Sequence, residues 1–434
     1  MKFTIILTGI VLLSIALIPK CYSYDYSLIK HNIGSALEAD GFEYIDIDLD
    51  GKKDIVVSNS TIGVISWYKQ NSLNSWTKYY IGDTGGTSVQ GSCVGDVNND
   101  NETEVFIIDK TISYLYMFYQ DTSQTPTGSW SNVSIDNNIN TGQSCRLDDL
   151  DNDGDLDLYY SSEGQILGNG GLYWLEYKGG DVTNVSNWDK HTIKQIEGAW
   201  GTLLNRTDIN GDGKKEIVFT TREKANVAAT GGVRYVIPND TITSEWELHT
   251  IDDTTYVPLH LTIGNFTGLS NLDIVSAGLD DGSTGIYLYN YSDSYSRSVL
   301  VSGTAWYNVQ AANLDNWGRD ELIANDYNGG NLLRVYVYNN VTNTYILNSS
   351  QSYNKADDDI FVDDIDKDGY NEIITISQDN NSIDWFNTLS YNGGKITINA
   401  NTNTISTTLN KGVGRNYTTT NNIINWQNII WGYY

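Results

Sequence analysis

A short acidic loop recurs seven times along this chain, and each copy is followed at once by an apolar run typical of a β-strand. Two clear copies are residues 46–54, Asp-Ile-Asp-Leu-Asp-Gly-Lys-Lys-Asp, and residues 149–157, Asp-Leu-Asp-Asn-Asp-Gly-Asp-Leu-Asp. The loops begin at residues 46, 96, 149, 208, 265, 313 and 364, so the period is roughly 50 residues, which is typical of a repeat architecture.

The repeats share one order of strands. An apolar segment leads into the loop, a second run follows it, and a third strand carries aromatic residues such as Trp67, Trp174 and Trp385. A fourth strand closes most units, as at 76–81, 188–193 and 246–251. β-branched and aromatic residues punctuated by Gly, Asn and Asp predict strands throughout. Seven units of four strands predict an all-β fold, a seven-bladed β-propeller.

The two ends of the repeat region complement each other. Residues 26–33 match the fourth-strand pattern, whereas the seventh repeat loses its pattern after residue 386. We therefore expect the N-terminal strand to complete the last blade and remove its exposed edge. The predicted domains are the propeller at 24–387 and a short β-rich extension at 388–434, with a strand at 395–400. The extension either packs on the propeller or contacts a neighbouring molecule.

The first 23 residues resemble an export signal. Lys2 precedes an apolar run at 5–18, and Tyr22-Ser23 is a plausible cleavage region. A membrane anchor is the alternative, but the run is short for a membrane span. Asn-x-Ser/Thr sequons, for example at Asn59 and Asn132, fit a glycosylated exported protein. We expect a secreted or cell-surface protein without membrane insertion.

The net charge of −28 excludes a nucleic-acid binder held by phosphate contacts. It also argues against docking on anionic lipid. Two cysteines, Cys93 and Cys145, lie shortly before successive acidic loops. They form either a disulfide, as an oxidising compartment allows, or a pair of buried free thiols.

The loop pattern suits a hard cation. Carboxylates at positions 1, 3, 5 and 9 supply the oxygen ligands that Ca²⁺ prefers, and glycine at position 6 permits a sharp turn. An EF-hand would need Glu at position 12, where four copies instead have Val57, Tyr160, Phe219 and Thr375. Cys and His are absent from the loops, which argues against thiolate or imidazole metal sites. The alternative is that the loops are solvated acidic turns.

The copies differ in completeness. The first, third, fourth and seventh are complete, whereas Asn101 replaces the glycine in the second and Trp317 stands at a ligand position in the sixth. The fifth, 265–273, has lost most ligands, and we expect it to hold no ion. The predicted calcium ligands are Asp46, Asp48, Asp50, Asp54, Asp96, Asn98, Asp100, Glu104, Asp149, Asp151, Asp153, Asp157, Asp208, Asn210, Asp212, Glu216, Asn313, Asp315, Glu321, Asp364, Asp366, Asp368 and Glu372.

With these loops, residues 26–387 resemble the FG-GAP and VCBS repeat families, which include the propeller of integrin α chains and certain fungal lectin propellers. The resemblance implies Ca²⁺ in the complete loops and leaves the fifth and sixth in doubt. An explicit Phe-Gly/Gly-Ala-Pro signature is not legible, which places the chain nearer the VCBS branch.

No catalytic set is evident in the sequence. Three of the four histidines, His31, His191 and His249, fall in fourth-strand segments, and no Gly-x-Ser-x-Gly elbow or phosphate loop is present. Connections opposite the acidic loops carry aromatic and charged residues that suit a glycan or a protein partner. Packing between blades is the alternative for each aromatic. The predicted ligand-binding residues are Trp200, Trp306, Tyr256, Tyr327, Glu163 and Arg222.

Three functions fit the sequence. The first is a secreted, calcium-binding recognition or adhesion module that binds a glycan or an extracellular protein on the face opposite the loops. The second is a polysaccharide-active enzyme, similar to lyases or dehydratases, and the third is a structural surface-assembly protein that uses residues 388–434. The oligomeric state and the ligand's identity stay open.

Overall fold

The computed structural model describes residues 26–36, 38–120, 127–164, 170–196, 199–203, 206–221, 231–253, 258–269, 271–278, 285–303, 306–315, 318–326, 332–353, 360–377, 381–399, 404–411 and 415–420. The export-signal prediction at 1–23 lies outside these residues. Within them, no helix is both long and apolar enough to cross a membrane.

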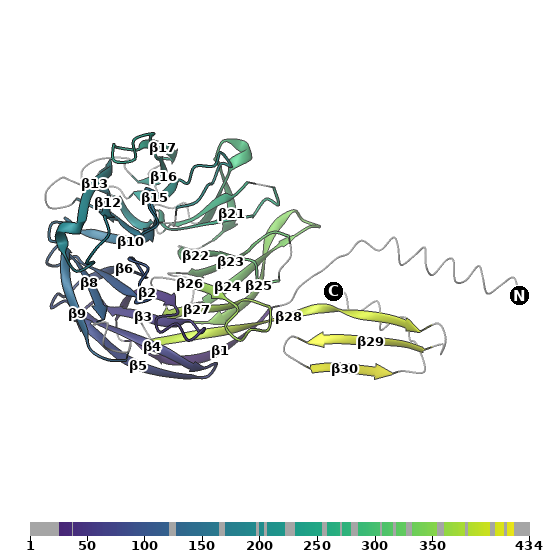
Figure 1. Ribbon diagram of the computed structural model, residues 1–434. Coiled ribbons are helices and arrows are strands. Elements are labelled where there is room, and N and C mark those ends of the chain that lie inside the picture. The colour runs from purple at the N-terminus through teal and green to yellow at the C-terminus, as the bar shows by residue number, and fades with distance from the viewer. Residues whose placement is uncertain are drawn as a thin grey trace, which may run out of the picture. The chain divides into compact units, whose positions relative to one another are not determined.

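Seven antiparallel sheets follow one another around a ring, which confirms the seven-bladed propeller (Figure 1). Short 3₁₀ turns, η1 (Val185–Asn187) and η2 (Tyr291–Asp293), are the helical elements of the described residues. The blades are β2 (Ala39–Ile45), β3 (Asp54–Asn59), β4 (Val64–Ser72) and β5 (Ser75–Asp83); β6 (Val89–Gly95), β7 (Glu104–Asp109), β8 (Tyr114–Gln120) and β9 (Trp130–Asp136); β10 (Gly142–Asp148), β11 (Asp157–Ser162), β12 (Gly171–Tyr177) and β13 (Trp188–Gln195); β14 (Ala199–Leu203), β15 (Ile217–Thr221), β16 (Gly232–Ile237) and β17 (Glu247–Asp252); β18 (Pro258–Gly264), β19 (Asp273–Gly278), β20 (Gly285–Asn290) and β21 (Ser296–Ser302); β22 (Trp306–Ala312), β23 (Glu321–Asp326), β24 (Leu332–Asn339) and β25 (Thr344–Ser352); and β26 (Ile360–Asp363), β27 (Glu372–Ser377) and β28 (Ser382–Asn399) with β1 (Tyr26–Ser35).

The core lies between blades rather than within one sheet. The second strands are buried along their length, as in β7 and β11, while outer strands such as β5 and β21 are largely exposed. Trp67 of blade 1 packs in one cluster with Val105 and Phe118 of blade 2. Truncating a ring buried in this way costs about 3–5 kcal/mol, so each blade depends on its neighbour.

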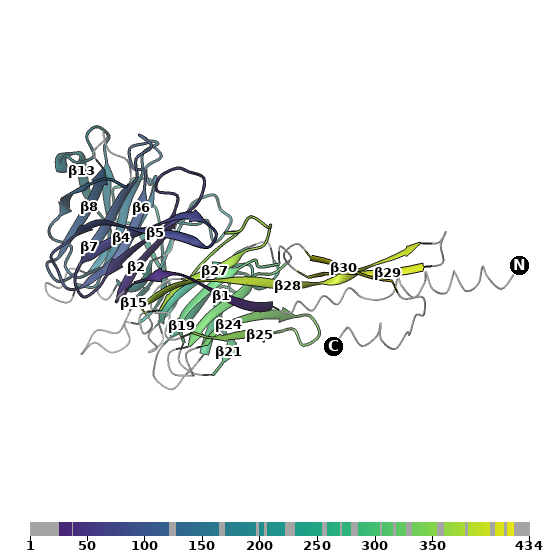
Figure 2. The same cartoon turned by 90° about the horizontal axis from the view of Figure 1, so that it is seen from below.

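The N-terminal strand closes the ring, as predicted. β1 pairs with β28, and the two strands run side by side in Figure 2. Asp384 of β28 is fully buried; Asn32 donates to its carboxylate at 2.9 Å and the Lys30 ammonium lies 2.9 Å away. His31 stacks on Trp385 with ring centroids 4.1 Å apart. The last blade is therefore held by polar and aromatic contacts from the other end of the chain.

A disulfide joins two neighbouring blades. Cys93 of β6 and Cys145 of β10 are bonded, with their Cα atoms 5.7 Å apart, which settles the choice between a disulfide and free thiols. Both lie in the apolar cluster between blades 2 and 3. The bond joins two residues that are 52 positions apart in the sequence, and it fixes one blade against the next.

The compact propeller unit spans Leu28–Thr388, and the chain from Leu389 belongs to a second unit. In that second unit, the end of β28 pairs with β29 (Thr404–Lys411), and β29 pairs with β30 (Arg415–Thr420). The described residues of the extension form strands, and the expected strand at 395–400 lies in β28 up to Asn399.

Candidate functional site

The acidic loops all connect the first and second strands of their blades, so they share one rim of the propeller. We number them loops 1 to 7: 46–54, 96–104, 149–157, 208–216, 265–273, 313–321 and 364–372. Adjacent loops touch. Lys367 of loop 7 donates to the Gly51 carbonyl of loop 1 at 3.2 Å, and Asn99 of loop 2 donates to the Gly154 carbonyl of loop 3 at 2.9 Å. Hydrogen bonds therefore link neighbouring loops at these two places on the rim.

Each complete loop is wound around its first acid. Asp364 accepts the backbone N–H groups of Asp368 and Gly369, both at 2.9 Å. Position 6 has positive φ, as at Gly369 (91°), and Asn101 adopts 68°, which confirms that asparagine can replace the glycine. Position 4 is also left-handed, for example Lys367 at 59°, a requirement that the sequence did not reveal.

The acid at position 9 closes the loop in every copy. Its carboxylate accepts the backbone N–H of position 2: Leu150 donates to Asp157, and Phe266 donates to Asp273, both at 3.0 Å. The same bond is made by Asp54, Glu104, Glu216, Glu321 and Glu372. Asp157 also accepts the N–H of Tyr177 at 2.9 Å, which ties in the third strand. Sequence reasoning assigned six of these acids, all except Asp273, to a metal and missed this bond.

Burial changes the acidity of these position-9 groups. Desolvation raises the pKa of Asp54 and of Asp157 to about 7, and the pKa of Glu372 to about 8. Hydrogen bonds from backbone amides oppose the shift, and neighbouring acids add to it. A cation in the loop would favour the ionised forms.

Three loops bring three carboxylates together. Asp46, Asp48 and Asp50, then Asp149, Asp151 and Asp157, then Asp364, Asp366 and Glu372 each offer oxygens within 4.8 Å of one another. Such oxygen sets fit Ca²⁺. The like charges also repel one another. The pKa of Asp151 is raised mainly by burial and further by the neighbouring acids Asp153, Glu176 and Asp149. A divalent cation would relieve that repulsion.

The residue two positions after the third-strand tryptophan distinguishes these three loops. Strand pairing places Lys69, Glu176 and Asn387 at equivalent positions in blades 1, 3 and 7. Glu176 adds a negative charge beside Asp151, and Asn387 donates to Asp366 at 3.3 Å. The third blade therefore carries the most negative loop of the three.

Loop 1 differs because Lys69 supplies its positive charge. The ammonium donates to Asp48 and, at 2.8 Å, to Asp50. These bonds, with one from Lys52, lower the pKa of Asp50 to about 2. Loop 1 therefore has a cationic side chain at the position where loops 3 and 7 have Glu176 and Asn387.

Loops 2 and 4 place an asparagine at position 3. The amide of Asn98 donates to Asp100 at 2.9 Å, and that of Asn210 donates to Asp212 and to Glu216, both at 3.1 Å. Turning either amide would present its oxygen instead. These loops fit a cation with fewer charged ligands.

Loop 5 meets an arginine from loop 6. Arg319 donates to the Phe266 carbonyl at 3.0 Å. Burial raises the pKa of Asp273, and the charge of Arg319 opposes that rise. Asp320 accepts the N–H of Asn265 at 2.7 Å. In loop 6, Asp315 and Glu321 are buried and Asn313 is partly exposed, whereas position 5 lies outside the described residues.

The predicted ligand residues are only partly described. Trp306 is 1% exposed and packs edge-on against Tyr336 between blades, which corrects the prediction that it offers a stacking surface. Glu163 is also buried and accepts a hydrogen bond from Gln143 at 3.2 Å. Arg222, Tyr256, Tyr327 and the Trp200 side chain lie outside the described residues.

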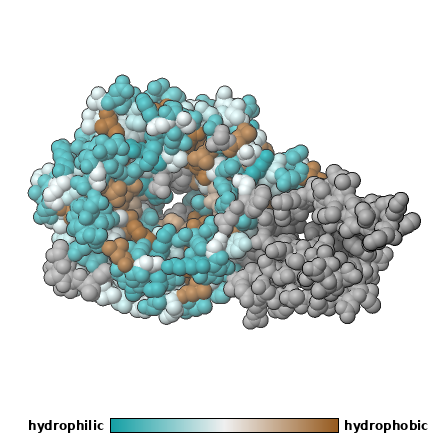
Figure 3. All heavy atoms as spheres, turned by 45° about the vertical axis from the view of Figure 1, so that its right-hand side comes forward, coloured by the Kyte–Doolittle hydropathy of each residue, from teal (hydrophilic) through white to brown (hydrophobic). Residues whose placement is uncertain are grey.

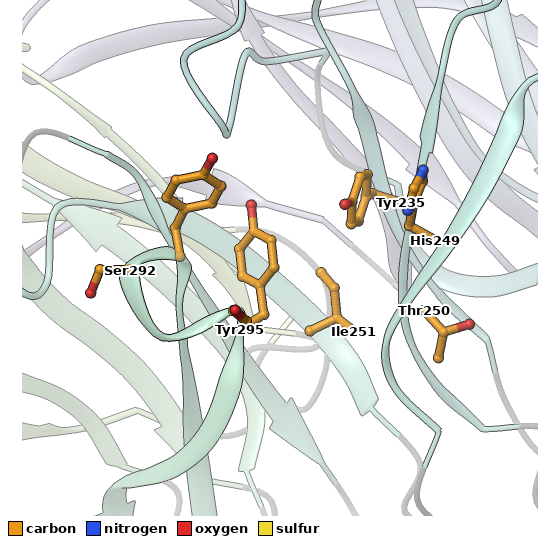
Figure 4. Close-up of a pocket in the computed structure, with 8 residues that line it drawn as sticks. Tyr235, His249, Thr250, Ile251, Ser292 and Tyr295 are labelled. Carbon is orange, nitrogen blue, oxygen red and sulfur yellow. The ribbon is translucent and has the colours of Figure 1, made fainter.

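An aromatic pocket of about 460 Å³ lies where blades 4 and 5 meet. Figure 4 shows its lining residues, with Tyr235 and Tyr295 facing the same space. The lining is Tyr235, His249, Thr250, Ile251, Tyr291, Ser292, Ser294 and Tyr295. Because η2 joins the third and fourth strands of blade 5, this pocket shares the rim of the acidic loops. Sequence reasoning sought ligands on the opposite face and missed it.

A channel passes through the ring of blades. Figure 3 shows the central opening, with small hydrophobic patches around it on a mostly polar face.

Fold and loops define a seven-bladed propeller built from repeats with an acidic loop between the first two strands of each blade. Residues 46–107 and 149–219 match a family described as FG-GAP-like repeat. The chain carries FG-GAP-like repeats on this propeller and fits the FG-GAP repeat family. Together they support a propeller module of the recognition or adhesion type.

Solved structures share the fold at low identity. A virginiamycin B lyase from Staphylococcus aureus aligns with a TM-score of 0.52 at 10% identity, over 83% of this chain and 99% of that one. A structure of the Dos1 propeller aligns with a TM-score of 0.47 at 10% identity, over 81% of each chain. No curated protein matches the chain. At this identity the likeness to the lyase extends to the fold alone.

Proposed function

We propose that this protein is an exported, calcium-stabilised recognition propeller that binds a glycan or an extracellular protein. The observation that carries the calcium assignment is the gathering of three carboxylates within 4.8 Å in loops 3 and 7. Carboxylate oxygens around a tight turn suit Ca²⁺, and extracellular sites bind it at roughly 10⁻⁴ to 10⁻³ M. Loops 2 and 4 are weaker sites in this proposal, and Lys69 takes the place of the ion in loop 1.

The disulfide supports the exported location. Cys93 and Cys145 are bonded, and disulfides persist in oxidising compartments. The apolar run after Lys2 and the sequons point in the same direction.

A calcium titration of thermal stability tests the structural half of the proposal. Calcium that binds only the folded state stabilises it by about 2.7 kcal/mol at one hundred times its Kd, so the melting temperature should rise with calcium and fall in EDTA. Asp366→Ala should abolish part of that response, whereas Asn265→Ala in loop 5 should keep it. An identical melt in calcium and in EDTA would overturn the proposal.

A glycan array in calcium tests the recognition half. Retention on a defined glycan class, without release of shortened products, is the expected result for a glycan-binding module. Product formation from polysaccharides would instead favour the enzyme hypothesis.

A further inference from the structure

We propose that the pocket between blades 4 and 5 binds a protonated alkylamine, the chemistry of a lysine side chain presented by an extracellular protein. This inference rests on the proposed recognition function and specifies one partner class for it. The supporting features are the arrangement of the rings, the surrounding carboxylates and an unsatisfied hydroxyl group.

The tyrosine rings surround a space rather than form a flat platform. Tyr235 is backed by His249, with centroids 4.7 Å apart and planes 9° apart, so one face of its ring is covered. Tyr295 lies 6.0 Å from Tyr235 at 56°, and 5.5 Å from Tyr291 at 72°. Rings inclined in this way can turn more than one π face toward a single cation.

The electrostatic surroundings favour a positive ligand. Besides burial, Glu216, Glu247 and Asp212 contribute to raising the pKa of Tyr235, and Glu216 and Asp273 do so for Tyr295. A carboxylate oxygen of Glu247 lies 3.2 Å from Nε2 of His249. The nearby Arg234 guanidinium is bonded to Thr250 at 2.6 Å and Thr221 at 3.1 Å.

The Tyr295 hydroxyl lacks a partner. Its oxygen is buried and makes no hydrogen bond within the described part of the chain. A buried polar group left unpaired costs about 1–3 kcal/mol, which an N–H donor from a ligand would recover. Figure 4 shows the rings of Tyr295 and Tyr235 as neighbours in the lining of the pocket. An ammonium group can donate to the Tyr295 oxygen and contact the rings together.

The test is a titration of the full chain, followed by NMR, with two ligands that differ in charge. Nα-acetyl-lysinamide carries the ammonium, and Nα-acetyl-norleucinamide is its neutral analogue. We expect the first to bind and the second not to bind. Tyr295→Phe should weaken binding about tenfold because it removes a charge-assisted hydrogen bond, and Tyr235→Leu should weaken it several-fold.

Tyr80→Phe is the matched control, because Tyr80 is 60% exposed on β5 of blade 1, and it should leave binding unchanged. Equal binding of both ligands, unchanged binding by Tyr295→Phe or no binding at all would overturn the inference. A chain that fails here but still melts higher in calcium and binds a glycan would retain the proposed function, which separates the two failures.

Discussion

The acid at position 9 has a structural task that does not require a metal. Asp273 retains it in loop 5, where most other ligand positions have changed, and accepts the N–H of Phe266, the N–H of Thr267 and the Thr267 hydroxyl. The same residue type would also ligate an ion in the complete loops. Sequence alone cannot separate the two roles, because both need an acid at this position.

Replacing Asp273 tests the structural role free of calcium. Asp273→Ala leaves buried donors without an acceptor, so the free energy of unfolding should fall by about 2–3 kcal/mol. The loss should be equal in calcium and in EDTA. Asn265→Ala, at a more exposed end of the same loop, should cost about 1 kcal/mol or less. Urea unfolding of both variants measures this, and a calcium-dependent loss at Asp273 would contradict the account.

Exchanging the charges of Lys69 and Glu176 tests how the third strand sets loop occupancy. Lys69→Glu should add one bound calcium per molecule, because it removes the ammonium from loop 1 and adds a carboxylate. Glu176→Lys should remove one, because the new ammonium would reach loop 3. Atomic absorption after equilibrium dialysis counts the ions. Lys78→Met on β5, whose ammonium lies over the Tyr68 ring, is the control and should leave the count unchanged.

At the scale of elements, the sequence period predicted the strands, the loop positions and closure by residues 26–33. It could not predict that Lys69 would contact loop 1. Lys69 lies on β4, whereas loop 1 joins β2 and β3, so the contact depends on the pairing of strands in the folded sheet. The disulfide stayed open because Cys93 and Cys145 stand at different distances from their loops. Adjacent first strands of successive blades bring them together all the same.

Ring closure through Asp384 is testable by hydrogen exchange. Asp384→Ala removes the acceptor for Asn32 and the partner of Lys30, so the protein should lose about 2 kcal/mol or more. Exchange should accelerate in β1 and β28 before blades 3 to 5 respond. Asp189→Ala removes a half-exposed carboxylate of β13, and it should change neither the stability of the protein nor the exchange rates of β1 and β28. Uniform acceleration across all blades by Asp384→Ala would contradict a local closure role.

For the whole molecule, the buried acids predict the pH dependence of the calcium-free protein. Their folded pKa values, about 7 for Asp54 and Asp157 and about 8 for Glu104 and Glu372, exceed the ordinary values near 4. At pH values between the ordinary and the folded pKa values, the folded state therefore binds more protons than the unfolded state. In EDTA, stability should fall as pH rises from about 4 to about 8. Chemical denaturation across this range measures it, and calcium should reduce or reverse the decline.

The central claim is that calcium occupies the most acidic loops and that a lysine replaces it in loop 1. The most direct measurement is an anomalous difference map from crystals grown in millimolar calcium. The account predicts peaks among Asp149, Asp151 and Asp157 and among Asp364, Asp366 and Glu372, with no peak between Asp48 and Lys69. Empty loops 3 and 7, or a peak in loop 1 with Lys69 displaced, would contradict it.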